Sequence, residues 1–251
     1  MGDDPADGRS QRRWLRPAGC LLALLMLAGT GTWLVGAVRD AREAARSTQC
    51  RGHFKYLALA FHTYHDTYGC FPPAYVADAD GKPMHSWRVL LLPFVDQAKV
   101  YEQYRFDEPW DSPHNRTLAS KIYAPLYQCP SGAHFETTTH TDYVVIVGPE
   151  TLFPGTTTTR LSDIADGSEH TLLLVEIANS DIDWMEPRDL RADEMSFALN
   201  DPGHPSISSP HPRGPCVALA DGNVRHLNAP VIPSTLEAMT TIAGGEPATL
   251  E

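Results

Sequence analysis

The apolar residues near the amino terminus form one uninterrupted run. Residues 18–38 carry no charged side chain, and at about 1.5 Å per residue a helix of this length crosses the apolar core of a bilayer. A cleavable secretory signal is the alternative, but its apolar region is usually shorter and is followed by an Ala-x-Ala-like site. We therefore expect an uncleaved transmembrane helix over residues 18–38, preceded by a cytoplasmic segment, residues 1–17.

The helical pattern continues beyond this run. Residues 39–68 are rich in Ala, Arg and Glu at first, and then place Phe54, Leu57, Phe61, Tyr64 and Tyr68 at spacings of three and four residues. This spacing puts the five side chains on one helix face. A glycine and a proline pair then end the pattern. We expect residues 39–68 to extend the helical stem and to pack this face against a head, residues 69–251.

The second half of the head has the pattern of β-strands. Three β-rich runs, residues 143–147, 171–175 and 216–219, are bounded by turn residues. Asp221 and Gly222 follow the last run, with the spacing of a two-residue type I′ hairpin turn. The whole pattern predicts an α+β fold, in which a long amino-terminal membrane-spanning helix carries a small antiparallel-sheet head.

The charge of the chain excludes one class of partner. The 20 basic and 31 acidic residues give a formal net charge of −11, whereas nucleic-acid-binding proteins need a basic face. Basic residues flank the apolar run on both sides, so they do not decide its orientation. Because long domains translocate largely regardless of charge, we expect a single-pass protein of the cytoplasmic membrane with its carboxyl-terminal head on the extracytoplasmic side.

Several long motifs are shared with one bacterial family. The stretch AREAARSTQCRGHFKYLALAFHTYHDTYGCFPPAY is followed in order by SWRVLLLPFVDQ, YQCPS, TDYVVIVGP, DIADGSEHTLLLVEIA and WMEPRDL. Over about residues 40–245 the chain resembles the domain-of-unknown-function family 1559 (DUF1559). His211, nine residues and then Asp221-Gly222 are similar to the prepilin-type processing-associated motif. The resemblance implies the layout of type IV pilins and pseudopilins, with the lipid bilayer and other pilin-like subunits or envelope components as partners.

One position departs from the pilin pattern. Pilin-like relatives usually carry a Glu at the fifth residue after the cleavage glycine, but here Gly19 is followed at that place by Leu24. In pilins this carboxylate pairs with the amino terminus of a neighbour, because a carboxylate in lipid is costly unless it is paired. We therefore expect a static, membrane-anchored relative of the pilins and leave cleavage of the amino terminus open.

Enzyme chemistry has little support in the sequence. Gly-x-Ser-x-Gly, His-Glu-x-x-His, Cys-x-x-Cys and phosphate-binding glycine loops are all absent. His211 and Asp221 have the residue types of a base and its orienting carboxylate, but nothing marks a nucleophile. We expect this pair to stabilise the hairpin, and we predict a non-enzymatic protein without a cofactor. The motifs of the resemblance make Glu176, Trp184 and Asp189 further structural or interaction candidates.

Metal ligation and disulfide bonding have separate candidates. Residues 163–201 hold 11 carboxylates and two arginines, and Ca²⁺ prefers such oxygen ligands. The spacing fits no calcium loop, so a solvated acidic face is the alternative; the candidate ligands are Asp181, Asp183 and Asp189. Cys50 and Cys129 lie in two of the motifs that resemble the family, and this pair is our first choice for a disulfide. Free buried cysteines are the alternative.

A second function belongs to a different class. Trp87, Trp110 and Trp184 together with the acidic residues suit the recognition of a sugar or a cation. The alternative is therefore a membrane-anchored extracytoplasmic module that binds a small, sugar-like solute. A pocket lined by at least two of these tryptophans would favour it, and a filled core beneath the sheet would favour the structural role.

Overall fold

The computed structural model describes residues 11–119, 125–133, 135, 139–228 and 231–245; for residues 11–25, 27 and 28 it describes the backbone alone. The chain divides into two units, residues 1–45 and residues 46–251. Helix α1 (Gln11–Tyr68) contributes to both units, which confirms the prediction of a long amino-terminal helix.

The predicted transmembrane segment, residues 18–38, lies partly among residues whose side chains are outside the described part. Within the described part of the chain, no helix is apolar over a length sufficient to cross a membrane.

The second unit combines short helices with three small sheets. The main sheet has the strand order β3-β5-β7-β8, with antiparallel neighbours throughout; β1 and β2 form an antiparallel pair, and β4 and β6 form a parallel pair. The elements after α1 are β1 (Tyr75–Ala77), β2 (Pro83–Ser86), α2 (Trp87–Leu90), η1 (Leu92–Phe94), α3 (Ala98–Tyr101), α4 (Pro113–Ala119), η2 (Pro125–Tyr127), β3 (Tyr143–Val144), β4 (Ile146–Val147), η3 (Leu161–Asp163), β5 (Leu172–Glu176), β6 (Leu190–Arg191), β7 (Cys216–Leu219), β8 (Val224–His226) and α5 (Pro233–Ala238).

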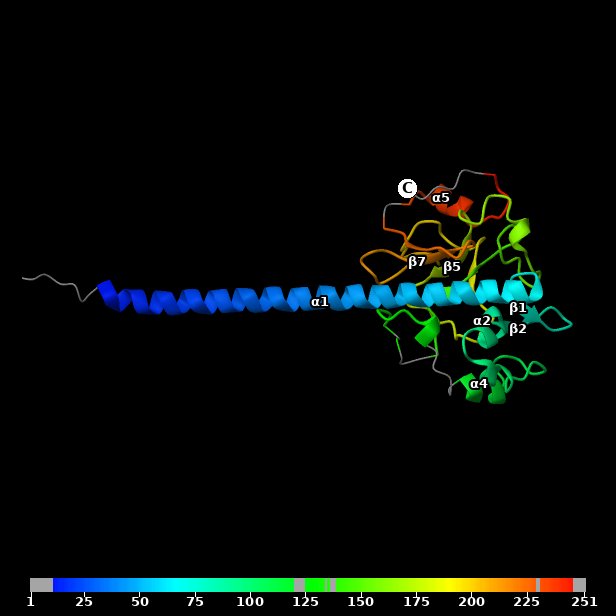
Figure 1. Cartoon of the computed structure of the whole chain (residues 1–251), viewed down its shortest axis with the longest axis horizontal. Helices are drawn as coiled ribbons and strands as arrows, with labels where there is room; N and C mark the ends of the chain where they lie inside the picture. Colours follow the sequence, from blue (N-terminus) through cyan, green and yellow to red (C-terminus); the bar gives the residue numbers. More distant parts are fainter. Residues whose placement is uncertain (1–10, 120–124, 134, 136–138, 229–230, 246–251) are drawn as a thin grey trace, which may run out of the picture. The chain divides into compact units, whose positions relative to one another are not determined.

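The main sheet separates two apolar cores. In Figure 1, β5 and β7 lie between the carboxyl-terminal part of α1 and the short helix α5. Side chains of a strand alternate between the two faces, so Leu174 and Ala218 pack in the core that includes α1, whereas Val175 and Val217 pack in the core that includes α5. Both faces are therefore covered, which explains why every residue of β5 and β7 is buried.

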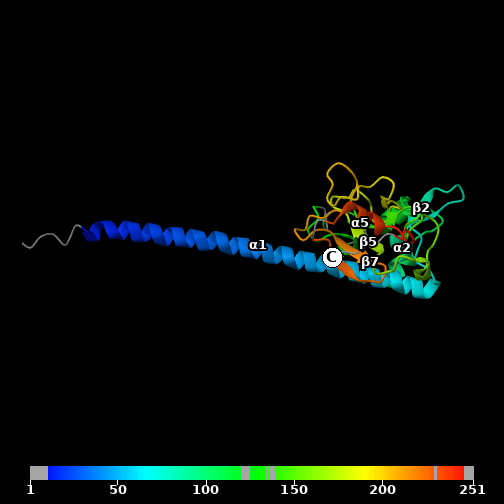
Figure 2. The ribbon, with the colours of Figure 1, turned by 90° about the horizontal axis from the view of Figure 1, so that it is seen from above.

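The predicted face of the stem packs in the first of these cores. Phe54, Leu57 and Phe61 are fully buried, whereas Leu59 on the same helix is 62 % exposed. The ring of Phe61 packs 4.9 Å from the ring of Trp87, measured between centroids. Figures 1 and 2 both show α2 beside the end of α1. The prediction that this face is buried against the head is thus confirmed for Phe54, Leu57 and Phe61. It is wrong for Tyr68, which lies at the end of α1 and is 58 % exposed, and Tyr64 is half-buried.

The predicted strand over residues 143–147 is split in two. β3 belongs to the main sheet, whereas β4 pairs with β6. Between them, the backbone N–H of Val145 donates to the carboxylate of Asp189 at 3.1 Å. In a continuous strand this N–H would donate to a neighbouring strand. Here it donates to Asp189, which is distant in sequence, and the strand is interrupted at Val145.

The hairpin between β7 and β8 has a different turn from the predicted type I′. Gly222 has a φ of +85°, but Asp221 does not have a positive φ, and a type I′ turn needs both. Leu219 pairs instead with Asn223 across a three-residue loop, which is a type I turn followed by a left-handed glycine. The carboxylate of Asp221 stabilises this form by accepting the backbone N–H of Asn223 at 2.9 Å.

Because one face of the stem is buried, alanine substitutions on that face should destabilise the protein more than a substitution on the exposed face. Leu57→Ala or Phe61→Ala should lower the free energy of unfolding of the full-length protein by about 2–5 kcal/mol, because each leaves a cavity. The matched control Leu59→Ala, on the exposed side of the same helix, should change it by less than about 0.5 kcal/mol. Denaturant unfolding measures all three, and equal effects at positions 57 and 59 would contradict the burial of this face.

Replacing glycine by alanine should change the stability of the protein in opposite directions at Gly222, in the hairpin loop, and at Gly52, in α1. Gly222→Ala should destabilise the protein by about 1–2 kcal/mol, because a Cβ is strained at positive φ, and it would also lie 3.3 Å from Nε2 of His62. Gly52→Ala, in α1 with open space around its Cβ position, should stabilise by about 0.5–1 kcal/mol. Thermal unfolding compares the two variants, and a stabilising Gly222→Ala would contradict this turn.

Candidate functional site

Four titratable side chains from distant parts of the chain meet in the core between α1 and the main sheet. One potential ligand atom from each lies within 4.8 Å of the others, and all four residues are buried. They come from α1, from the loop after η2, from the end of β5 and from the loop before β7. The members of this Cys-Cys-Glu-His cluster are Cys50, Cys129, Glu176 and His211.

Local structure directs these side chains toward one another. Cys50 lies four and seven residues before Phe54 and Leu57, so it shares their face of α1. Glu176 is paired with Tyr143 across β5 and β3, and it lies two residues after Leu174, on the same face of the sheet. The sheet and the helix therefore each present one ligand to the space between them.

The distances within the cluster are short. Nε2 of His211 lies 3.2 Å from Sγ of Cys129 and 4.0 Å from Oε1 of Glu176. The other carboxylate oxygen, Oε2 of Glu176, accepts the backbone N–H of Cys216 at 2.8 Å. The hydroxyl of Tyr143 lies 3.3 Å from Sγ of Cys50 and can donate to it. Hydrogen bonds from surrounding groups thus hold the carboxylate and one thiol in place.

Burial shapes the electrostatics of the cluster. The neighbouring thiol of Cys50 and burial both raise the pKa of Cys129 above its ordinary range. Burial likewise raises the pKa of Glu176. Burial acts on both groups in the same way, because a negative charge is costly in an apolar core. The imidazole of His211 opposes the increase in both pKa values.

The candidate disulfide falls within this cluster. The structure brings Cys50 and Cys129 together, and both are free thiols in it. Cys70 and Cys216 are also free thiols. The Cys50–Cys129 disulfide stays a prediction.

The structure does not bring His211 and Asp221 together as a base and its orienting carboxylate. His211 is buried in the cluster, whereas Asp221 is in the loop at the tip of the hairpin, with its carboxylate bonded to Asn223. The tip instead lies close to His62 of α1.

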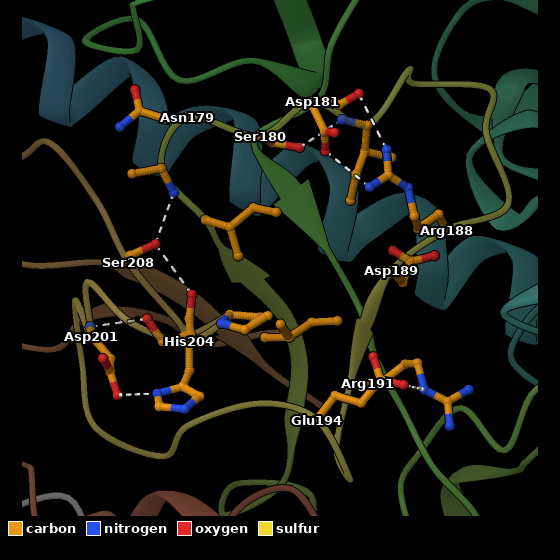
Figure 3. A pocket seen from close by; sticks show the side chains of 16 residues that line it. Asn179, Ser180, Asp181, Arg188, Asp189, Arg191, Glu194, Asp201, His204 and Ser208 are labelled. Atoms are coloured by element: carbon orange, nitrogen blue, oxygen red, sulfur yellow. Dashed lines mark hydrogen bonds and ion pairs between the residues drawn. The ribbon is translucent and has the colours of Figure 1, made fainter.

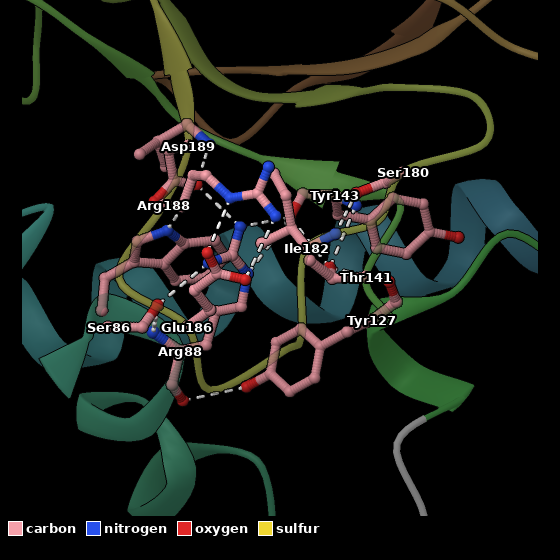
Figure 4. Close-up of polar contacts among 12 residues, drawn as sticks. Ser86, Arg88, Tyr127, Thr141, Tyr143, Ser180, Ile182, Glu186, Arg188 and Asp189 are labelled. Atoms are coloured by element: carbon pink, nitrogen blue, oxygen red, sulfur yellow. Dashed lines mark hydrogen bonds and ion pairs between the residues drawn. The ribbon is translucent and has the colours of Figure 1, made fainter. Parts of the chain in front are cut away.

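A buried ion pair joins α2 to the segment before β6. Figure 4 shows Arg88 and Asp189 facing one another in the core, with 2.7 Å between Nη2 and Oδ1. Oδ1 of Asp189 also accepts the indole N–H of Trp87 at 3.2 Å and the backbone N–H of Val145 at 3.1 Å. Burial raises the pKa of Asp189, and the guanidinium of Arg88 opposes this effect. These contacts give Asp189 a structural role in the core.

The three candidate calcium ligands face different partners. Asp181 pairs with Arg188 at 2.9 Å, Asp189 pairs with Arg88, and Asp183 accepts the hydroxyl of Thr139. Within the described part of the chain, the Cys-Cys-Glu-His cluster is the only group of three or more such residues close enough to hold a metal ion. The structure therefore does not assemble the aspartates into a site.

A cavity lined by both charged and apolar side chains opens on the surface beside these aspartates. It has a volume of about 460 Å³, and Figure 3 shows that charged side chains surround it. Arg188 pairs there with Asp181. Nδ1 of His204 lies 3.4 Å from Oδ2 of Asp201. None of the three candidate tryptophans lines this cavity.

The tryptophans predicted to line a pocket instead fill the core. Trp87 and Trp184 are fully buried. The ring of Trp184 stacks on the ring of Tyr127 with 5.6 Å between centroids, and Trp110 is half-buried against the same core. Because these tryptophans fill the core and do not line the surface cavity, the arrangement favours a structural role for them.

Comparison with known proteins identifies a family. A model of the family described as "Protein of unknown function (DUF1559)" matches residues 39–199. The chain belongs to this family. The matched part of the DUF1559 chain contains Cys50, Cys129 and Glu176 but ends before His211, so the prepilin-type processing-associated motif stays a prediction. No curated protein and no solved structure is significantly similar to the chain.

Sequence reasoning identified the members of the cluster singly and missed the set. The sequence predicts a disulfide between Cys50 and Cys129, and it places Glu176 and His211 in two other motifs. A signal was present in the LLLVEIA motif, where Glu176 directly follows a fully apolar run. A carboxylate at the end of a buried strand needs a partner, and the chain offers thiols and imidazoles for that role.

The buried ion pair predicts a large effect of removing one partner. Asp189→Ala should lower the free energy of unfolding by about 3–5 kcal/mol, because Arg88 would remain buried without a counter-charge. The matched control Asp193→Ala removes an exposed partner of Arg191 and should have no measurable effect. Chemical denaturation of both variants provides the test, and similar stabilities would show that Arg88 and Asp189 are not buried as a pair.

Proposed function

We propose that this DUF1559 protein is a non-enzymatic, pilin-like membrane protein. The amino-terminal part of α1 anchors it in the cytoplasmic membrane, and the head on the extracytoplasmic side serves assembly or interaction at the cell surface. Lipid is the first partner in this proposal, and other pilin-like subunits or envelope components are the partners of the head.

The observation that carries the proposal is the exposure of apolar side chains on α1. Between residues 26 and 38, five large apolar side chains are 41–73 % exposed. Such a concentration is costly in water and suits an apolar surrounding. They are Met26, Trp33, Leu34, Val35 and Val38.

Hydrogen bonding in the same part of α1 also supports an anchor. The hydroxyl of Thr30 donates to the carbonyl of Met26, and that of Thr32 donates to the carbonyl of Gly29, both at 2.9 Å. In lipid, where water cannot satisfy polar groups, helices bond such hydroxyls internally. The two threonines are thus compatible with an apolar surrounding, and the sequence over residues 18–38 adds the absence of charge.

The packing of the stem supports a role in positioning the head. The face of α1 that carries Phe54, Leu57 and Phe61 belongs to the core of the second unit. The head therefore cannot rotate freely on this part of the helix without losing buried contacts. A head held in this way suits assembly, in which orientation decides which surface meets a partner.

The surface cavity of Figure 3 favours a second function, the binding of a small solute with polar groups. Arg188 and His204 could bind carboxylate or hydroxyl groups there. Both already pair with aspartates of the protein, so a solute would have to replace these contacts. For this reason we place solute binding second.

The anchor predicts where the protein is found after cell fractionation. A full-length chain with a reporter that is active only outside the cytoplasm, fused after Glu251, should be active and should stay in the membrane pellet after an alkaline wash. The double variant Met26→Glu/Leu27→Glu should move to the soluble fraction, because these positions lie near the middle of residues 18–38 and a charge at the centre of a membrane helix costs about 2.5–3.5 kcal/mol.

The control variant carries one such charge at an exposed apolar residue of the head. Ile232→Glu, at a side chain 65 % exposed, should stay in the membrane pellet. Release of the unmodified protein by the alkaline wash would contradict the anchor. Activity of the reporter placed before Met1, with no activity after Glu251, would reverse the orientation.

A further inference from the structure

The Cys-Cys-Glu-His cluster has the chemistry of a metal site. Two thiols, one imidazole and one carboxylate are the ligand types that zinc takes in proteins. Thiolate ligands select zinc and other soft ions over Ca²⁺ and Mg²⁺, which prefer oxygen alone. The cluster thus differs in kind from the acidic side chains around the surface cavity.

The spacing of the ligand atoms fits a single ion. Zinc binds sulfur at about 2.3 Å and nitrogen or oxygen at about 2.0–2.2 Å, so two ligands of a tetrahedral site lie about 3.3–3.8 Å apart. Nε2 of His211 is 3.2 Å from Sγ of Cys129 and 4.0 Å from Oε1 of Glu176. The first distance already matches the tetrahedral spacing to a few tenths of an ångström. The second distance, and any pair as wide as the 4.8 Å limit of the cluster, would close by up to about 1 Å on metal binding.

An unsatisfied carboxylate oxygen provides an independent indication. Oε1 of Glu176 is buried and has no hydrogen-bond partner, whereas Oε2 of the same group accepts the N–H of Cys216. A buried polar atom without a partner costs free energy, and native proteins rarely leave one. The unsatisfied atom is the one that faces His211, on the side of the cluster where an ion would lie.

The surroundings hold the ligands as those of metal sites are held. The backbone N–H of Cys129 donates to Oδ2 of Asp142 at 2.7 Å, and the hydroxyl of Tyr143 lies within reach of Sγ of Cys50. Groups of this kind orient metal ligands and raise the affinity of a site. With the contact from Cys216, three of the four ligand residues are fixed by neighbouring groups.

We propose that the Cys-Cys-Glu-His cluster binds one zinc ion as a structural site. Four protein ligands complete a tetrahedral shell and leave no position for a substrate, which is typical of structural rather than catalytic zinc. The ion joins α1, the loop after η2, the end of β5 and the loop before β7. Its role is to lock the helical stem to the head.

Metal analysis tests the proposal directly. We would purify the full-length protein without a histidine tag, chelator or added reductant, and measure its zinc content by mass spectrometry. We expect about one zinc ion per chain in the unmodified protein and in the control Cys70→Ser, whose thiol lies outside the cluster. Glu176→Gln and Cys129→Ser should lose the ion, and zinc contents equal to that of the unmodified protein in both would overturn the site.

A second measurement does not depend on the folding of any variant. The unmodified protein, stripped of metal by a chelator, is titrated with cobalt chloride. We expect the visible absorption of tetrahedral cobalt with thiolate ligands, saturating at one equivalent, and a melting temperature that rises with the added metal. Saturation without a thiolate-to-cobalt band would overturn the assignment of the ligands.

The alternative to metal binding, a disulfide in the cluster, can be recognised by mass and by alkylation. A disulfide between Cys50 and Cys129 would make the intact mass lower by two hydrogen atoms and would protect both thiols from alkylation. A zinc-free protein with that mass, as purified, would overturn the proposal and establish the predicted disulfide instead. Alkylatable thiols at both positions, together with bound zinc, would support the metal site.

Discussion

The head depends on the burial of one face of α1. Its strands have only two to five residues each, and small sheets of this kind need a packed layer to be stable. Phe54, Leu57 and Phe61 supply that layer on one side of the main sheet, and each contributes roughly 1.5–3 kcal/mol through burial. The last part of the stem is therefore a component of the core of the head, and the two cannot be separated without exposing apolar surface.

The same buried layer contains two polar groups that are satisfied to different degrees. Around Asp189, the guanidinium of Arg88, an indole N–H and a backbone N–H all donate to one carboxylate oxygen. Around Glu176, one oxygen accepts a backbone N–H and the other has no partner. The hydrogen bonds to Asp189 come entirely from the protein, and they indicate a structural role for this residue. The protein alone leaves one carboxylate oxygen of Glu176 without a partner. A bound cation would contact this oxygen, and it therefore explains the arrangement better than the protein groups alone.

The elements that the sequence predicted are those whose signals are local. The apolar spacing of Phe54, Leu57 and Phe61 is a property of a few helical turns, and the structure confirms both the helix and its buried face. The run over residues 143–147 also has a local β signal. Its division depends on Asp189, which is distant in sequence, so no local pattern could show it.

The turn and the cluster were missed for related physical reasons. The Asp-Gly pair favours several hairpin turns, and the hydrogen bond between Asp221 and Asn223 favours the three-residue loop over the shorter one. The cluster needs four segments to converge, and each segment alone has an ordinary alternative. Cysteines in a predicted extracytoplasmic head suggest a disulfide, and only the tertiary structure places a carboxylate and an imidazole against them.

The geometry of the cluster separates the two chemistries that its thiols allow. A Cys50–Cys129 disulfide would use both sulfur atoms but would leave Oε1 of Glu176 buried without a partner and Nε2 of His211 beside a sulfur that no longer carries a proton. Zinc would use all four side chains, including the carboxylate oxygen of Glu176 that has no hydrogen-bond partner. A disulfide joins only the stem and one loop, whereas an ion also joins the sheet. The metal site therefore accounts for more of the buried polar atoms, and it ties the stem to the main sheet and to two loops.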